Sequence, residues 1–388
     1  MRLARRMEQL GTESALSVGE RVRELVAHGR DVIALHIGEP DLDTPSNVIE
    51  AACRALADGA TRYPPPAGLP ALREAVATDS VRRRGGETSP AQVVVTPGAK
   101  PVVALALMAL ADPGSEVIVP DPGFPTYASM ARALGVTPVP LALRAENDFR
   151  IDLDALRAAV TPRTRMLVLN SPHNPTGGIL DRSDLEAVAA VAMANDIVVL
   201  SDEIYGRLAY DRPAESILAI DGMAEHAIVL DGVSKTYAMT GWRLGWAIVP
   251  RRFAEPFERL VINTFTGTAP HVQLAAVEAL TGPQTAVEEM VAEFRARRSL
   301  LVDGLRALPG LDVPMPAGAF YVFPDVSRTG MDGDRFAERL LMEAGVSVLA
   351  GSGFGDVGRD HVRISYASSR EDLRRALVRM AGSLRSSG

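Results

Sequence analysis

The sequence has a single cysteine, no long apolar run and no excess of positive charge. Cys53 is the only cysteine among 388 residues, which excludes an internal disulfide and a metal site built from several thiolates. Because Cys53 lies in an alanine-rich amphipathic stretch, we expect its side chain to be buried rather than to act as a nucleophile. No window approaches the roughly 18 consecutive apolar residues of a membrane-spanning helix, and the first residues lack the apolar segment of a signal peptide. These absences predict a cytoplasmic protein without a membrane span.

The charge balance is mildly acidic. Lys and Arg number 41 and Asp and Glu number 48, so the formal net charge is −7. Nucleic-acid-binding surfaces normally need clustered positive charge, so this balance argues against a nucleic-acid partner. Basic clusters at residues 82–84, 295–298 and 374–375 lie in helical patterns, and we expect them to form solvated helix faces. The six histidines are scattered without a pair four residues apart on a helix, so we expect no metal site.

Short β-branched runs alternate with longer amphipathic stretches along the first three quarters of the chain. Because these runs lack polar alternation, they are typical of strands buried on both faces of a mostly parallel sheet. The pattern therefore predicts an α/β fold with helices on both sides of the sheet. The predicted strands cover residues 92–96, 116–120, 165–170, 197–201, 227–232 and 244–250.

The pattern changes after Gly282 and Pro283. The segment AVEEMVAEFRARRSLLVDGLRAL predicts one long helix from about residue 284, and a further helix is expected at about 335–343. We therefore expect a large domain at 44–282 and a smaller α+β domain at 283–388. The N-terminal segment, residues 1–43, contains a predicted helix at about 17–27 and is expected to join the smaller domain.

Lys235 is the first candidate for chemistry. It follows a predicted strand, in the segment DGVSKTYAMTGWRLGWAIV (231–249), whose glycines and tryptophans indicate a tightly packed turn. An ammonium held there, near Arg243, would have a lowered pKa, as an amine that attacks an aldehyde requires. The planar fork of Arg243 suits a phosphate dianion. A lone Ser-Lys pair is otherwise most simply a surface lysine.

Three further segments place polar groups where ligands bind in α/β folds. VVVTPGAKPVVALAL (93–107) forms a strand, a turn at Gly98 and a helix start that could hold an anion, although such turns are common. Asn174, Asp202 and Tyr205 follow predicted strands, at the sheet edge where open α/β sheets bind ligands. Asp202 could pair with a protonated ring nitrogen. The alternative reading is an Asn-Pro-Thr-Gly turn and a helix cap.

Arg363 lies in the apolar strand HVRISYASS (361–369). A buried arginine needs an anionic partner, and either a substrate carboxylate or an internal Asp or Glu would serve.

These segments occur together, in one order, and the whole chain resembles a known family. Through HIGEPDLDTP (36–45), YPPPAGLPALREAVA, SPHNPTGG, SKTYAMTGWRLGW, GAFYVFP and VRISYA, it resembles the class I/II aminotransferases, fold-type I pyridoxal 5′-phosphate (PLP) enzymes of the broad aspartate aminotransferase family. The resemblance implies a seven-stranded, mostly parallel sheet sandwiched by helices. It also implies ping-pong transfer of an amino group from an L-amino acid to a 2-oxo acid. Another PLP reaction on the same scaffold, such as elimination, oxidation or decarboxylation, is the alternative.

The resemblance further implies the roles of individual residues. Lys235 would form a Schiff base with PLP and move a proton between the substrate Cα and the cofactor C4′, with Asp202 and Tyr205 as the other catalytic residues. The implied cofactor-binding residues are Gly98, Ala99, Lys100, Phe124, Asn174, Asp202, Tyr205, Ser234, Lys235, Arg243 and Tyr63. The implied substrate-binding residues are Gly38, Asn174, Arg363 and Lys100.

Quaternary structure and donor preference follow from the same resemblance. Tyr63 would reach the phosphate bound in a neighbouring subunit, which implies a homodimer with shared active sites. Some aspartate-specific relatives use an arginine of the loop that matches residues 263–273, and this loop has none. Lys100 could instead bind the distal carboxylate of aspartate or glutamate, or it could be an ordinary solvated lysine. On this basis acidic donors are favoured over aromatic, branched, alanine-type or specialised ones.

Overall fold

The computed structural model describes residues 2–11 and 13–385. Its main feature is a seven-stranded sheet, in which β8 is antiparallel to both neighbours and the other pairs are parallel. This architecture confirms the predicted α/β fold with a mostly parallel sheet. In spatial order the strands are β2 (Val93–Thr96), β8 (Gly245–Ile248), β7 (Ala227–Gly232), β6 (Val198–Asp202), β5 (Thr164–Asn170), β3 (Glu116–Asp121) and β4 (Thr137–Ala142).

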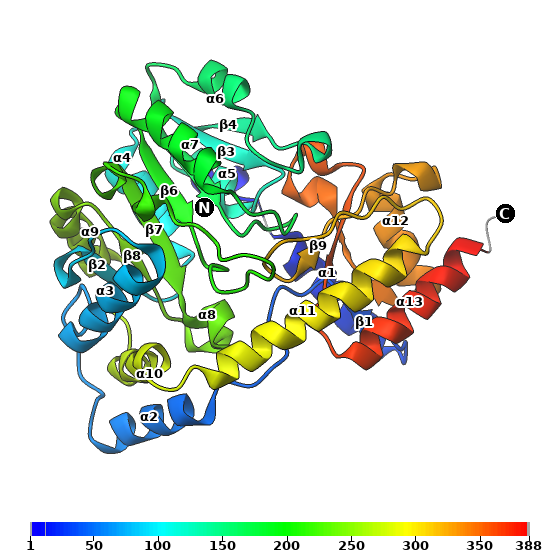
Figure 1. Ribbon diagram of the computed structural model, residues 1–388, viewed down its shortest axis with the longest axis horizontal. Helices are drawn as coiled ribbons and strands as arrows, with labels where there is room; N and C mark the ends of the chain where they lie inside the picture. Colours follow the sequence, from blue (N-terminus) through cyan, green and yellow to red (C-terminus); the bar gives the residue numbers. More distant parts are fainter. Residues whose placement is uncertain (1, 12, 386–388) are drawn as a thin grey trace.

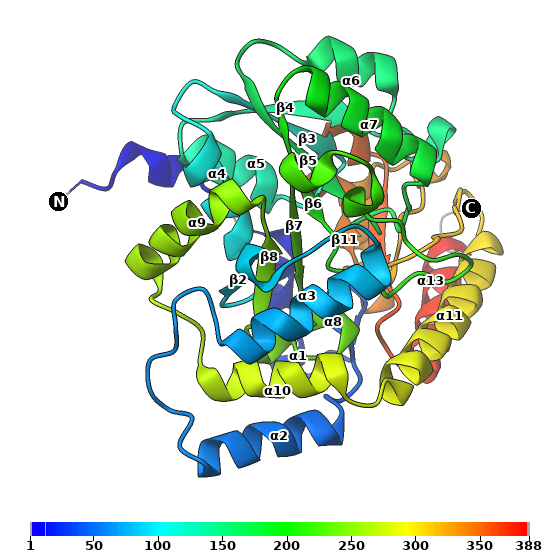
Figure 2. The ribbon, with the colours of Figure 1, turned by 60° about the vertical axis from the view of Figure 1, so that its left-hand side comes forward.

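Helices cover both faces of this sheet, with a separate hydrophobic core on each face. Successive strand residues alternate between the cores: Met166 and Val168 contribute to one, and Leu167 and Leu169 to the other. On the first face lie α4 (Pro101–Leu110), α5 (Thr126–Ala133) and α9 (Arg251–Thr264). On the second lie α3 (Pro70–Arg84), α6 (Leu153–Ala159), α7 (Arg182–Ala194) and α10 (Pro270–Thr281). Figure 2 shows α2 (Ser46–Ala57) as an outer layer against α10.

The rest of the chain forms a smaller group of elements beside the sheet. The long helix α11 (Thr285–Arg306) was predicted as one helix, and Figure 1 shows it running beside α13 (Arg370–Arg385). The predicted helix at 335–343 is α12 (Gly333–Arg339), continued as a π-helix through Leu340–Ala344. Two short sheets complete the group, formed by β11 (Leu349–Ala350), β12 (Val362–Ser365) and β9 (Tyr321–Val322), and by β1 (Ile33–Ala34) and β10 (Val346–Ser347).

Residues 14–34 of the N-terminal segment lie against this smaller group. Strand β1 pairs in parallel with β10, and Arg21 of α1 (Ser14–Ala27) forms an ion pair with Glu338 of α12 at 2.5 Å. The residues before α1 extend away from this group toward the sheet, where the backbone N–H of Gly11 donates to the Ser129 hydroxyl at 3.0 Å. The division into domains at residues 44 and 283 remains a prediction. Within the described ranges, no helix combines the length and apolar character needed to cross a membrane.

The prediction that the basic clusters are solvated helix faces was wrong for three arginines. Arg84, Arg297 and Arg298 are only 6%, 5% and 6% exposed. Each guanidinium pairs with carboxylates from elsewhere in the chain, as Arg84 does with Glu203 at 2.7 Å and with Asp231. A buried arginine is tolerated when carboxylates accept hydrogen bonds from its guanidinium group. Folding brings these carboxylates next to the arginine, so the sequence does not reveal the pairing. Residues 374–375 are exposed as expected.

The predicted burial of Cys53 was also wrong, because its side chain is exposed. On α2 the buried side chains are Val48, Ala52 and Ala55, which share the face directed at α10. Cys53 follows Ala52 by one residue, about 100° around the helix, and therefore points away from that face.

Candidate functional site

A cavity of about 290 Å³ lies beyond the carboxyl ends of β5, β6 and β7. This is the edge at which open α/β sheets bind ligands. Most residues singled out from the sequence line it together, although they are far apart in the chain. The predicted residues that line the cavity are Gly38, Ala99, Lys100, Phe124, Asn174, Asp202, Tyr205, Ser234, Lys235, Arg243 and Arg363.

Lys235 extends into this cavity from α8 (Val233–Thr236), which begins directly after β7. Its Nζ donates a hydrogen bond of 2.5 Å to the carbonyl oxygen of Gly38. Burial lowers the pKa of the amine to about 8, because desolvation penalises the charged form and only part of this is offset by the nearby Glu39. At mildly alkaline pH a substantial fraction of Lys235 is therefore the neutral amine that can attack a carbonyl carbon.

An anion site lies beside Lys235, where α4 begins. The backbone N–H groups of Ala99 and Lys100 have no acceptor among the described residues. The Arg243 guanidinium packs so closely on Gly98 that a Cβ at that position would collide with it. Gly98 also has a φ of +94°, a left-handed conformation that favours glycine. The free amides, the helix start and the guanidinium fork together suit a phosphate.

Asp202 lies at the end of β6, deep in the cavity. It accepts hydrogen bonds from the Tyr127 hydroxyl at 2.6 Å and from the backbone N–H of Ile204 at 3.2 Å. The second bond closes a turn, because no helix begins directly after β6, so the helix cap that we considered from the sequence is not found. Burial raises the pKa of this carboxyl to about 6, so it is mostly ionised at pH 7. A buried carboxylate of this kind can hold a cationic ring nitrogen.

Arg363 is 4% exposed and projects from β12 into the same cavity. Its Nη atoms donate to the side-chain oxygen of Asn174 at 3.0 Å and to the carbonyl oxygen of His36 at 2.8 Å, while its Nε has no partner. In the described part of the chain, no Asp or Glu forms an ion pair with it. The internal acid that the sequence left open is thus not found, and this buried cation lacks the anion that it needs.

Several residues of the cavity lining were not singled out from the sequence, and Tyr127, Tyr321 and Glu13 are those that contact the predicted ones. Tyr127 bonds to Asp202, and the Tyr321 hydroxyl lies 2.8 Å from that of Tyr205, while the Tyr321 ring lies 4.3 Å from the Arg363 guanidinium carbon. Tyr321 stands in GAFYVFP, a motif used for the resemblance, and Tyr127 lies three residues after the predicted Phe124, so these two neighbourhoods were the available signal. Glu13 was missed because an acid before an N-terminal helix is unremarkable in sequence.

Glu13 pairs with Lys100 at the cavity. The Lys100 ammonium donates to Glu13 Oε1, and the Thr126 hydroxyl donates to the same oxygen at 3.2 Å. The Lys100 Nζ also lies 5.3 Å from the centre of the Phe124 ring. Lys100 is therefore neither a freely solvated lysine nor an unpaired cation.

Two predicted residues lie outside the lining. Gly98 lies directly against the Arg243 guanidinium, outside the cavity lining. Tyr63 is 90% exposed on the loop after α2 and does not line the cavity of its own chain.

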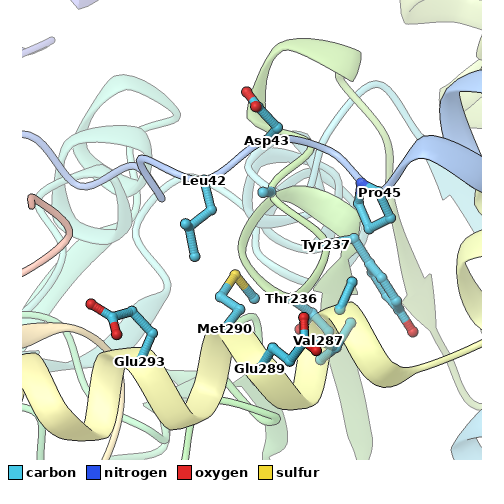
Figure 3. A pocket seen from close by; sticks show the side chains of 11 residues that line it. Leu42, Asp43, Pro45, Thr236, Tyr237, Val287, Glu289, Met290 and Glu293 are labelled. Carbon is cyan, nitrogen blue, oxygen red and sulfur yellow. The ribbon is translucent and has the colours of Figure 1, made fainter.

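A second cavity, of about 300 Å³, lies on another side of α8. Figure 3 shows it between residues 42–45 and α11, with Leu42 and Met290 facing each other across it. Asp43, Glu289 and Glu293 contribute carboxylates, and no lysine or arginine is among its lining residues. This cavity lacks the cations that a phosphate or a carboxylate needs, whereas Lys100, Lys235, Arg243 and Arg363 line the first cavity, which is therefore the candidate functional site.

Comparisons with known proteins agree with this geometry. The family model described as "Aminotransferase class I and II" matches residues 30–380. The aspartate/prephenate aminotransferase of Thermus thermophilus is 43% identical over 98% of both chains, and an arginine–pyruvate transaminase of Pseudomonas aeruginosa is 38% identical over 95% of this chain and 94% of its own. The solved structure of Thermus thermophilus aspartate aminotransferase with maleate has a TM-score of 0.95 and 42% identity, covering 99% of this chain and 100% of that one.

Proposed function

This chain belongs to the class I and II aminotransferases, which are PLP-dependent enzymes, and from this we propose how its own residues transfer an amino group between an L-amino acid and a 2-oxo acid. The strongest support is the cavity that unites Arg363, a buried cation with no acidic partner among the described residues, with Lys235, a buried amine of lowered pKa. One group binds a carboxylate and the other reacts with a carbonyl. An α-amino acid and an aldehyde cofactor present these two functions together.

The residues present fit PLP. The free amides at Ala99 and Lys100, with Arg243, would hold the phosphate, and the buried Ser234 lines the same region. Asp202 would accept a hydrogen bond from the protonated ring nitrogen, because its pKa of about 6 leaves it ionised at neutral pH. The cavity volume of about 290 Å³ suits a small cofactor and an amino acid. Phe124 would stack on the ring, and Tyr205 and Asn174 would contact its hydroxyl oxygen.

When bound, the cofactor supplies a ring that takes up the electron pair left on the substrate Cα after loss of its proton. Lys235 would hold the cofactor aldehyde covalently and, once displaced by the substrate amine, its Nζ would take the Cα proton and return it on the cofactor side. Arg363 would fix the α-carboxylate and thereby orient the Cα–H bond toward that amine. Asn174, already bonded to Arg363, would keep the guanidinium in position.

A homodimer with shared active sites is part of this proposal. Tyr63 is 90% exposed and lies outside its own cavity, so its hydroxyl is available to a neighbouring subunit. Leu3 and Met7 are 79% and 49% exposed in the N-terminal segment, as apolar side chains at a subunit contact would be in an isolated chain. Location in the cytoplasm, with amino acids and 2-oxo acids as the only partners, also remains a prediction.

The titration of Lys235 provides one test. Because burial lowers its pKa to about 8, we expect the cofactor-free protein to show a lysine that is mostly an ammonium below this pH and mostly a neutral amine above it. Lys100 and Lys235 are the only lysines in the sequence. Reductive ¹³C-methylation should therefore give two lysine signals in an NMR titration, assigned with Lys235→Arg. A midpoint for Lys235 near the ordinary lysine value of about 10.4 would contradict the buried, reactive amine.

A half-reaction screen tests the function as a whole. PLP-loaded enzyme mixed with single amino acids, without an acceptor, should convert the bound cofactor to its pyridoxamine form and release one equivalent of 2-oxo acid. Absorbance spectra and an assay for free ammonia give the readout. Ammonia release without accumulation of the pyridoxamine form would instead indicate elimination or oxidation on the same scaffold.

A further inference from the structure

Among the described residues that line the reaction cavity, Glu13 and Lys100 form the one ion pair. Glu13 precedes α1 and Lys100 precedes α4, and both side chains line the cavity that contains Lys235 and Arg363. The Glu13 side chain is 25% exposed and is also held by the Thr126 hydroxyl at 3.2 Å, whereas the Lys100 side chain is 48% exposed. The acid is thus the better anchored partner of the pair.

This inference rests on the proposed function, which assigns a role to each of the other three cationic side chains of the cavity. Arg243 holds the phosphate, Arg363 holds the α-carboxylate and Lys235 holds the cofactor. Lys100 is the remaining cationic side chain among the lining residues that the structure describes. Lys100 is therefore the cation with which a second carboxylate on the substrate would pair. Lys100 already forms an ion pair with Glu13.

We propose that Glu13 selects against donors with a second carboxylate, so that the enzyme prefers monocarboxylic amino acids whose side chains carry no negative charge. An acidic substrate side chain would either share one ammonium with Glu13 or displace an anchored carboxylate. Both outcomes place like charges together in a partly desolvated cavity, which is the usual way in which binding sites reject a wrong ligand. The Phe124 ring beside Lys100 offers an apolar surface to an uncharged side chain instead.

This proposal departs from the acidic-donor preference drawn from the sequence, which treated Lys100 as free or solvated. The names of the relatives already include enzymes acting on aspartate and on arginine, so membership of the family leaves the donor undecided. The local partner of Lys100 is the feature that decides it here.

The test is the variant Glu13→Gln, which removes the charge and keeps the shape. The wild-type enzyme should have a higher kcat/KM for leucine than for aspartate. Glu13→Gln should raise the aspartate-to-leucine ratio of kcat/KM by about 10- to 100-fold, as expected when a close like-charge contact is removed. The double variant Glu13→Gln/Lys100→Met should lose this gain. Glu20→Gln, which makes the same change on the exposed face of α1, serves as the matched control and should leave the ratio unchanged.

A binding measurement separates this inference from the proposed function. Calorimetric titration of the PLP-loaded protein with butanedioate and butanoate, which lack an amino group, needs no turnover. Glu13→Gln should strengthen butanedioate binding relative to butanoate by a similar factor. An unchanged ratio in a folded Glu13→Gln protein, or a wild-type preference for aspartate over leucine, would overturn the inference. If no amino acid reacts with the wild type, the proposed function fails. The ratio of butanedioate to butanoate affinity, compared between the wild type and Glu13→Gln, still tests the role of Glu13.

Discussion

Replacing Lys235 with alanine is expected to lower amino-group transfer by about 10⁴-fold, the upper end of what a positioned acid–base group contributes. Lys235 has two tasks in the proposed mechanism, since it holds the cofactor covalently and moves the Cα proton. In the described part of the chain, no other amine lies in the cavity except Lys100, whose ammonium pairs with Glu13. The anion site at Ala99, Lys100 and Arg243 remains intact in the variant, so PLP should still bind without a covalent bond.

Chemical trapping makes this prediction specific. Borohydride reduction of the PLP-loaded protein, followed by peptide mapping, should place the label on Lys235 alone, and only one other lysine exists in the sequence as a competitor. The Lys100→Met protein should still carry the label on Lys235, whereas Lys235→Ala should carry none on a lysine. A label on Lys100 in the wild type would refute the assignment.

Replacing Arg363 with glutamine is expected to lower kcat/KM for amino acids by about 10³-fold. Truncating one partner of a buried, hydrogen-bonded charge pair typically costs about 2–5 kcal/mol, and each 1.4 kcal/mol is roughly tenfold. Arg363 is 4% exposed and its Nε is unpartnered, so the substrate carboxylate would be its charge partner. Glutamine keeps a donor for Asn174 but loses both the charge and the fork. Lysine at this position should restore activity only in part, because it has no bidentate geometry.

Two controls separate this loss from a general weakening of the fold. Arg298 is a similarly buried arginine, but it pairs with Asp211 at 2.7 Å outside the cavity, so Arg298→Gln should lower stability without changing the KM for amino acids. An amine without an α-carboxylate should react slowly and at the same rate with wild type and Arg363→Gln. A similar loss for this amine would show that Arg363 acts through the fold rather than on the carboxylate.

The sheet was largely predictable because its strands are buried on both faces. Six of the seven strands appear in the sequence as uninterrupted apolar runs, which local composition alone reveals. The exception is β4, which contains Pro138 and Pro140 and therefore does not resemble a strand. It is tolerated because it lies at the edge of the sheet, where one side of the strand needs no hydrogen-bond partner. The seventh strand was expected only through the family resemblance.

The cavity was predictable to the extent that strand ends meet at one edge. Asn174 follows β5, Asp202 ends β6 and Lys235 lies in the helix directly after β7. Because these three strands are parallel neighbours, the convergence of the three residues follows from the topology. Tyr127 and Glu13 could not be assigned in the same way. Tyr127 and Asp202 are 75 residues apart in the chain, and Glu13 and Lys100 are 87 residues apart. Neither contact therefore leaves a local pattern in the sequence.

The sequence by itself determined the fold class and the family, and it predicted the reactive lysine, because buried strands and glycine-rich turns impose patterns on neighbouring residues. The tertiary structure alone decided which charges are satisfied. It paired Arg84 with Glu203 and Lys100 with Glu13, and it left Arg363 without an acid in the described chain. The free energy of a buried charge depends on the partners that surround it, and those partners come from distant parts of the chain. For this reason the sequence indicates the reaction, while the proposed donor preference rests on a charge pair that only the folded chain forms.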